Sequence, residues 1–145
     1  MRVGASVVLP LPPERAWGLL TRWEDQARWI KDADRVTVLS ATRVGVGVRI
    51  GVKTRVLNVP LFTDVLEVTI WDPPRRLVMA HRRLVRGMGI WALEPDVAGT
   101  RFTWIEDLSL GVPVVGELAL AVYRPVMGHL LRGALANLRA YALAT

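Results

Sequence analysis

The 145-residue sequence contains no cysteine and only two histidines, His81 and His129. The lack of cysteine excludes disulfides, a thiol nucleophile and thiolate metal sites. Two histidines are too few to favour a zinc site, and neither a Gly-x-Ser-x-Gly nor a His-Glu-x-x-His motif occurs. We therefore expect no metal and no cofactor, and the common hydrolase and metalloprotease signatures are missing.

A long uninterrupted hydrophobic run is also missing. The most apolar stretch, residues 108–123, contains Glu117 and is followed by Arg124, whereas a membrane-spanning helix needs about 20 apolar residues. The short apolar run near the N-terminus ends at Pro10, which leaves too little for the core of a secretory signal. The sequence thus predicts a cytoplasmic protein without a transmembrane segment.

Length and hydrophobicity predict one folded domain over residues 1–145. Domains are typically about 100–200 residues long, so this chain has the size of one. The hydrophobic fraction of 52% and the charged fraction of 22% differ from the composition of disordered chains. Neither fraction identifies a ligand. The oligomeric state is left open, and a homodimer is one of the alternatives.

The net charge of +6 comes almost entirely from arginine, because Lys31 and Lys53 are the only lysines. This bias reflects composition at least as much as a nucleic-acid partner. The densest cluster of basic residues consists of Arg75, Arg76, Arg82, Arg83 and Arg86. Such a cluster suits phosphate contacts, but it lacks the interleaved aromatic residues that stack on bases. We interpret it mainly as a solvated face and expect no nucleic-acid partner.

The residue pattern predicts one strand, two small helices, six strands and a long helix. The first strand covers residues 2–9, and Pro12-Pro13-Glu14 then opens a helix, since proline and an early acid suit a first turn. A second helical piece covers residues 24–31. After Pro113 the pattern is helical to about Leu143. Alternating or β-branched residues between turn signals predict the strands 36–39, 44–57, 62–71, 76–85, 88–93 and 100–110.

Three segments in this order resemble the START/polyketide-cyclase superfamily (SRPBCC, the helix-grip fold). They are Leu9-Pro10-Leu11-Pro12-Pro13-Glu14-Arg15-Ala16-Trp17-Gly18-Leu19-Leu20 followed by Trp29, Asp72-Pro73-Pro74-Arg75-Arg76-Leu77, and Gly99-Thr100-Arg101-Phe102-Thr103-Trp104. The resemblance covers nearly the whole chain. It implies an α+β helix-grip fold, in which a curved seven-stranded antiparallel sheet wraps around a long C-terminal helix and two short helices follow the first strand.

The same resemblance implies a deep apolar cavity between the sheet and the long helix. Such a cavity would hold a lipid, a polyketide or another small hydrophobic ligand. The resemblance does not imply an enzyme, because the superfamily contains enzymes, carriers and sensors on one scaffold.

Alternation in the strands predicts which side chains face the cavity. In residues 62–71 the more apolar set contains Asp64 and Leu66. A four-residue loop at 72–75 would place Trp71 opposite Arg76. Counting back from there places Leu66 opposite His81 and Asp64 opposite Arg83.

A similar count around Gly99 places Trp91 near Trp104 and Gly89 near Glu106, all facing inward. Because glycine has no side chain, Gly89 would leave room beside Glu106 for a ligand atom or a water molecule.

In the long helix, four charged residues define the expected solvent side: Glu117, Arg124, Arg132 and Arg139. The opposite side is Ala119, Val122, Tyr123, Val126, Leu130, Gly133, Ala134, Asn137 and Tyr141. Asn137 within this apolar stripe would need a polar partner.

Polar groups in an apolar cleft are the usual composition of a ligand site. The candidate ligand-binding residues are Asp64, Leu66, His81, Arg83, Trp91, Trp104, Glu106, Tyr123 and Asn137. Structural roles stay open beside this. Asp64 and Arg83 would then form a cross-strand ion pair, His81 and Asn137 would bond to the backbone, and Trp91 and Trp104 would belong to the core. No residue has nucleophile–base spacing, so no catalytic residue is assigned.

Three hypotheses follow. The first is binding of a small hydrophobic or amphipathic ligand, lipid- or polyketide-like, in the cavity. The second is a polyketide cyclase or aromatase that uses acid/base residues there. The third is an interaction protein that uses its arginine-rich edge.

Overall fold

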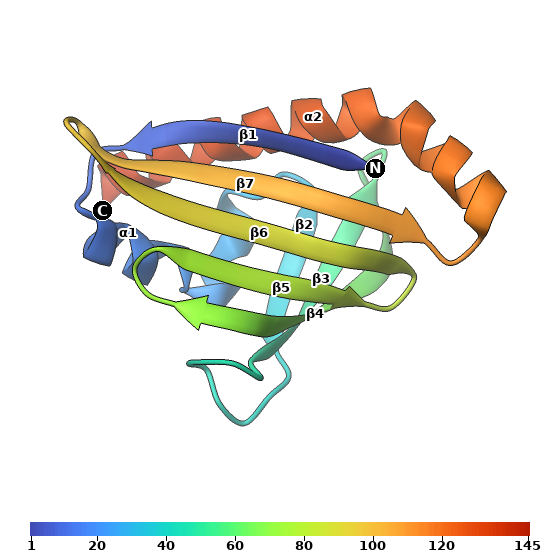
Figure 1. Cartoon of the computed structure of the whole chain (residues 1–145), viewed down its shortest axis with the longest axis horizontal. Helices are drawn as coiled ribbons and strands as arrows, with labels where there is room; N and C mark the ends of the chain where they lie inside the picture. Colours follow the sequence, from blue (N-terminus) through green and yellow to red (C-terminus); the bar gives the residue numbers. More distant parts are fainter.

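The computed structural model describes residues 1–145 as a curled seven-stranded antiparallel sheet with one long helix across its concave side (Figure 1). The strand order is β1-β7-β6-β5-β4-β3-β2. The elements in chain order are β1 (Arg2–Leu9), α1 (Pro13–Leu20), η1 (Trp23–Arg28), β2 (Ala33–Val38), β3 (Arg49–Val56), β4 (Val59–Asp72), β5 (Arg76–Arg82), β6 (Val85–Asp96), β7 (Gly99–Leu110) and α2 (Pro113–Ala144). The predicted α+β helix-grip architecture is therefore confirmed.

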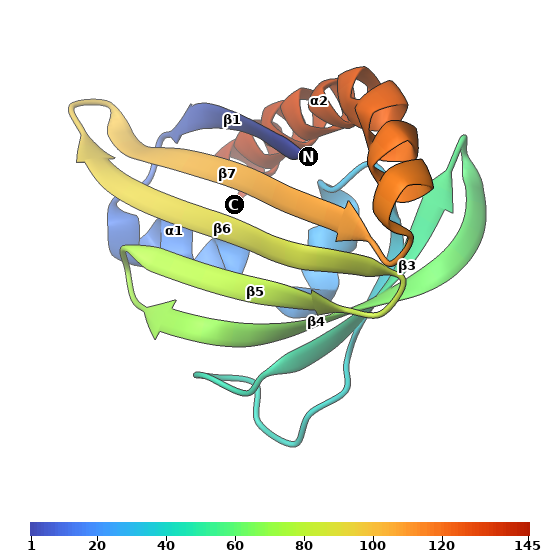
Figure 2. The same ribbon diagram turned by 45° about the vertical axis from the view of Figure 1, so that its right-hand side comes forward.

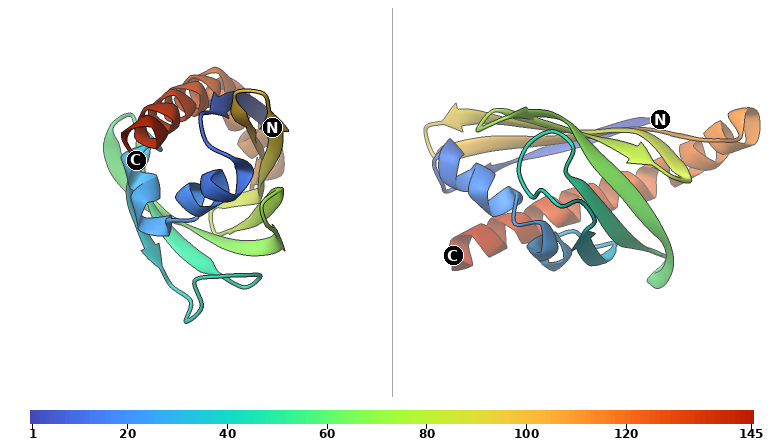
Figure 3. Two further views of the ribbon diagram at one scale, coloured as in Figure 1. Left: turned by 90° about the vertical axis from the view of Figure 1, so that its left-hand side faces the viewer. Right: turned by 90° about the horizontal axis from the view of Figure 1, so that it is seen from below.

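The two short helices lie together at one end of the curled sheet (Figure 3). Helix α1 begins at Pro13 and has Glu14 in its first turn, as the sequence predicts. Its buried face consists of Ala16, Trp17, Leu19 and Leu20. The second piece, η1, is a 3-10 helix that buries Trp23 and Gln26.

One predicted strand begins five residues too early. Residues 44–48 form a loop, and β3 begins only at Arg49. Gly45 and Gly47 have φ angles of +94° and +96°, a conformation that residues with a side chain rarely adopt. The valines between these glycines resemble a strand in the sequence, but the glycine conformations end the extended backbone.

The six tryptophans fill the end of the interior beside α1 and η1. Their ring centroids lie 5.1–6.3 Å apart in two groups, and most of the contacts between them are edge-to-face. The first group is Trp17, Trp23 and Trp71, and the second is Trp29, Trp91 and Trp104. We call these six residues the tryptophan core.

The inner face of helix α2 overlaps only in part with the face that the sequence predicts. Four residues of the predicted set line the space between α2 and the sheet: Ala119, Tyr123, Leu130 and Ala134. The buried residues of α2 are Gly116, Leu120, Gly128, Leu131, Ala134, Leu135, Leu138 and Ala142. Val122, Val126 and Asn137 are exposed, so their placement on the inner face is wrong. The prediction is only partly correct because α2 is apolar on both sides along its N-terminal half, where hydrophobicity does not mark the buried face.

The first turns of α2 extend beyond the end of β1 (Figures 1 and 2). Val114, Val115, Leu118 and Val122 are exposed there. By length and composition alone, α2 is apolar enough to cross a membrane, with a mean hydropathy of 1.3 over an 18-residue segment of which 22% is buried. A core helix passes the same test, and α2 supplies several residues to the hydrophobic core.

The arginine cluster lies on the outside of the domain. Arg75, Arg76, Arg82, Arg83 and Arg86 are all exposed, which confirms the predicted solvated face. Two of these residues form exposed ion pairs, Arg75 with Asp72 and Arg82 with Glu67.

Candidate functional site

A cavity of about 380 Å³ lies between the concave face of the sheet and α2. It is lined by 26 residues, of which 19 are hydrophobic. Strands β3 to β7 supply one wall, and α2 supplies the opposite wall with residues that include Leu120, Tyr123 and Ala134. The predicted space between the sheet and the long helix is therefore present.

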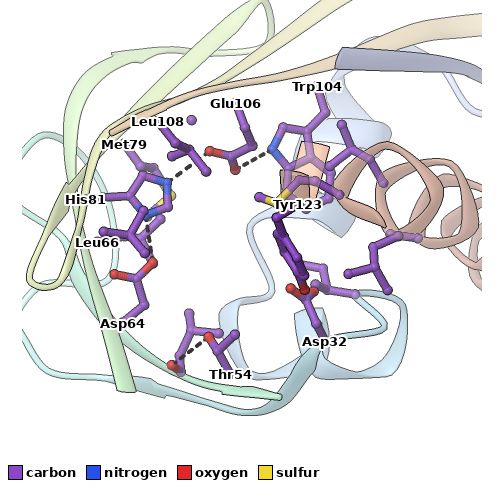
Figure 4. A pocket seen from close by; sticks show the side chains of 18 of the residues that line it. Asp32, Thr54, Asp64, Leu66, Met79, His81, Trp104, Glu106, Leu108 and Tyr123 are labelled. Carbon is purple, nitrogen blue, oxygen red and sulfur yellow. Dashed lines mark hydrogen bonds and ion pairs between the residues drawn. The ribbon is translucent and has the colours of Figure 1, made fainter. Parts of the chain in front are cut away.

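A hydrogen-bonded set of polar residues lies in the sheet wall of this cavity (Figure 4). The Nδ1 atom of His81 lies 2.6 Å from Oδ2 of Asp64, and Nε2 lies 2.9 Å from Oε2 of Glu106. The indole Nε1 of Trp104 donates a hydrogen bond of 2.8 Å to the other carboxylate oxygen of Glu106. We call these four residues the His81 network.

His81 carries a positive charge at neutral pH. Burial by itself would lower the pKa of its imidazole, but the hydrogen bonds and charges of Asp64 and Glu106 outweigh burial and raise the pKa to about 10. Both ring nitrogens of the protonated imidazole then donate to a carboxylate. The side chains of all three residues are at most 10% exposed.

The sheet register explains how residues on three different strands meet. His81 is on β5 and Glu106 is on β7, so β6 runs between them. Glu106 pairs with Gly89 of β6, and a Cβ atom at Gly89 would lie 3.1 Å from the nearer carboxylate oxygen of Glu106. The missing side chain at Gly89 leaves the space in which Glu106 reaches His81 across β6.

Most of the predicted pairings are confirmed. Trp91 pairs with Trp104, and Leu66 pairs with His81. The starting point of the count from the loop at 72–75 is wrong, because Trp71 pairs with Leu77 instead of Arg76. An irregularity between Val68 and Ile70 shifts the register by one residue and brings Leu66 opposite His81 after all.

The predicted pair of Asp64 and Arg83 does not form. Strand β5 ends at Arg82, and Arg83 lies exposed in the turn that follows. Asp64 instead bonds to His81, the last inward-facing residue of β5. Sequence alternation gives the correct face for His81 but does not show that the strand ends before Arg83.

Seven of the nine candidate residues line the cavity: Asp64, Leu66, His81, Trp91, Trp104, Glu106 and Tyr123. Arg83 and Asn137 lie outside it. Asn137 is exposed, and its Nδ2 donates a hydrogen bond of 3.4 Å to the backbone oxygen of Trp29. This contact links α2 to the residue after η1, which is a structural role.

Asp32 is a cavity residue that the sequence does not reveal. It follows η1 and lies beside Tyr123, across the cavity from His81 (Figure 4). Burial raises the pKa of Asp32, and the charges of Glu106 and Asp64 raise it further. Burial and the charge of Asp32 likewise raise the pKa of Tyr123. In the sequence, Asp32 stands between Lys31 and Ala33 in what looks like an ordinary solvated turn.

The chain matches a known family over nearly its full length. The family described as polyketide cyclase / dehydrase and lipid transport matches residues 1–143. No curated protein matches the chain.

Solved structures with this architecture share little sequence with the chain. TTHA0849 from Thermus thermophilus has a TM-score of 0.82 and 22% identity, and the match covers 99% of this chain and 98% of that one. The Zhui aromatase/cyclase from Streptomyces sp. R1128 has a TM-score of 0.81 and 15% identity, with 98% of this chain and 93% of that one covered.

The di-domain aromatase/cyclase StfQ of the steffimycin biosynthetic pathway has a TM-score of 0.75 and 17% identity. That match covers 99% of this chain and 50% of StfQ, so the chain corresponds in size to half of it. At these identities the structural likeness shows the fold, whereas the family match covers the sequence itself. The chain therefore belongs to the polyketide cyclase/dehydrase and lipid-transport family.

Proposed function

We propose that this protein binds a small hydrophobic or amphipathic molecule, lipid- or polyketide-like, in the cavity between the sheet and α2. The observation that carries the proposal is a 380 Å³ space with 19 hydrophobic residues among its 26 lining residues. Its polar groups are few, with the buried His81 network on the sheet wall. A mostly apolar pocket with a few placed polar groups is the usual form of a small-molecule site.

Apolar contact supplies most of the binding free energy in such a cavity. A ligand that loses about 200 Å² of apolar surface gains roughly 5 kcal/mol. Association also costs several kcal/mol of translational and rotational freedom. The polar end of the ligand therefore decides which of several apolar molecules is bound best.

The first experiment is native mass spectrometry of the purified protein, followed by solvent extraction of any bound molecule. A second measurement follows the fluorescence of the neutral, apolar dye N-phenyl-1-naphthylamine as it is titrated with protein. We expect binding of one dye molecule per chain. Nonspecific binding of the dye to the protein surface would not saturate at one dye molecule per chain.

A matched pair of substitutions locates the binding. Ala134 is buried in α2 and lines the cavity, whereas Ala136 is exposed two positions further along. Ala134→Leu fills part of the space and should weaken dye binding by about tenfold or more, while Ala136→Leu should leave it unchanged. Equal effects of the two substitutions would contradict binding in this cavity.

A second function, polyketide cyclase or aromatase activity, is favoured by His81 and its two carboxylates inside the cavity. A charged imidazole has a proton to give and cannot accept one, so His81 would act as an acid and Glu106 or Asp64 as the base. The test is the pH profile of cyclisation of a poly-β-keto substrate. A bell-shaped profile that His81→Ala or Glu106→Gln abolishes supports the activity, and an unchanged rate in both variants contradicts these assignments.

A further inference from the structure

We propose that the cavity selects ligands whose polar end is a hydrogen-bond donor, a protonated amine above all, and rejects ligands that end in a carboxylate or phosphate. This inference rests on the proposed binding function and names the chemical class of its ligand.

The first argument is the distribution of charge around the cavity. Its lining contains three carboxylic acids, Asp32, Asp64 and Glu106, and one base, His81. No lysine and no arginine is among the 26 lining residues, although the chain has 19 of them. The protein is basic on its outside, and its cavity is acidic.

The second argument is that His81 cannot recognise an anion. Both of its ring nitrogens are already engaged, one by Asp64 at 2.6 Å and the other by Glu106 at 2.9 Å. An anionic ligand would have to displace one of these buried carboxylates, which would then lose its partner. Leaving a buried charge without its partner costs several kcal/mol.

The third argument is that two acids keep acceptor capacity that the protein does not use. Asp64 is 7% exposed, and its second carboxylate oxygen is buried without a hydrogen-bond partner. Its charge therefore adds to the negative potential of the cavity wall. Asp32 lines the cavity on the opposite side, and its carboxyl group accepts a hydrogen bond from its own backbone but from no side chain (Figure 4).

A cation between these acids would relieve their mutual repulsion. The negative charges of Glu106 and Asp64 disfavour the ionised form of Asp32. Low-dielectric walls strengthen such interactions compared with water. Trp91 and Trp104 also line the cavity, and tryptophan rings attract cations.

The test uses three ligands with the same bicyclic ring: naphthylethylamine, naphthylethanol and naphthylacetate. Their affinities are measured by calorimetry at neutral pH. We expect the amine to bind at least about tenfold more tightly than the acid, which corresponds to about 1.4 kcal/mol. The alcohol, which donates a hydrogen bond but carries no charge, should lie between them.

Asp32→Asn should bring the amine to within about threefold of the alcohol. The control is Asp34→Asn, which removes the same charge from an exposed residue that pairs with Arg55 outside the cavity. This control should keep the full preference for the amine.

The outcomes separate this inference from the proposed function. If naphthylacetate binds as tightly as the amine, the inference is overturned while binding in the cavity stands. The same holds if Asp32→Asn and Asp34→Asn have equal effects. If none of the three ligands binds, the proposed function itself is overturned.

Discussion

The two ends of the interior are built by the same sheet and helix but are filled in opposite ways. Beside α1 and η1, the tryptophan core packs large rings against one another, and Trp23 and Trp29 are each only 1% exposed. Further along α2, the same layers enclose a cavity whose polar wall is the His81 network. Trp104 belongs to both regions, since its ring packs on Trp29 and its Nε1 bonds to Glu106.

The difference shows where the fold obtains its stability. Burial of large aromatic rings supplies a favourable free energy that a hollow region does not. Buried carboxylates cost desolvation free energy that their partners only partly return. The packed end therefore stabilises a domain whose other end is left open for a ligand. The three predictions below test this contrast, beginning with the largest expected effect.

Two leucines of α2 allow the contrast to be measured with the same substitution. Leu138 is fully buried and lies outside the cavity wall, whereas Leu120 is 7% exposed and lines the cavity. Leu138→Ala should lower the free energy of unfolding by about 4 kcal/mol, because it creates a new void in packed surroundings. Leu120→Ala should cost about 1–2 kcal/mol, because it only enlarges an existing space.

Urea denaturation followed by circular dichroism measures both values. The same cost for both substitutions would mean that the cavity is collapsed in solution and that the two ends do not differ.

The second prediction concerns the pH dependence of stability. The pKa of His81 rises from its ordinary value of 6.5 to about 10 in the folded protein. Folding therefore binds the His81 proton more tightly, and this contribution to stability is fully present below pH 6.5 and is lost as the pH rises toward 10. The total amounts to a few kcal/mol.

His81→Gln should remove this pH-dependent decline in stability. The substitution should also lower the free energy of unfolding by about 3 kcal/mol near neutral pH, because Asp64 and Glu106 lose the positive charge between them. His129→Gln is the matched control, since His129 is exposed on α2. The free energy of unfolding is measured for each variant between pH 6 and 10. A decline that persists in His81→Gln would show that another group causes it.

The smallest expected effect separates the two tyrosines. The hydroxyl of Tyr141 donates a hydrogen bond of 2.7 Å to Asp25 at the packed end, whereas Tyr123 lies in the cavity wall with no such bond to a side chain. Tyr141→Phe should therefore lower the free energy of unfolding by about 1 kcal/mol. Tyr123→Phe should change it by less than about 0.5 kcal/mol, and the reverse order would argue against the described hydrogen bonding.

The sequence predicts the fold well because the relevant signals are local. Proline at the start of α1, turn residues between the strands and a helical pattern after Pro113 each act within a few residues. The errors have two causes. The loop at 44–48 follows from the positive φ angles of Gly45 and Gly47, which the valines between them hide in the sequence. The buried face of α2 depends on what packs against the helix, because apolar residues occur on both of its sides.

The candidate site is predictable in part for a related reason. Alternation places Asp64, His81 and Glu106 on the inner face, because side chains point to alternate faces of any strand. The bond between His81 and Glu106 crosses an intervening strand, which no pairing count reveals. Asp32 lies in a turn, where no periodicity exists to give its direction.

The missing side chain at Gly89 has a consequence for reading related sequences. Glu106 and His81 meet only over the backbone of β6, at a point where a Cβ atom would already press on the carboxylate. A relative that keeps both residues but carries valine or leucine at this position would have to separate them. A glycine at this position therefore distinguishes relatives that form the buried contact between the acid and the imidazole. Relatives with a larger residue here keep the two amino acids without the contact between them.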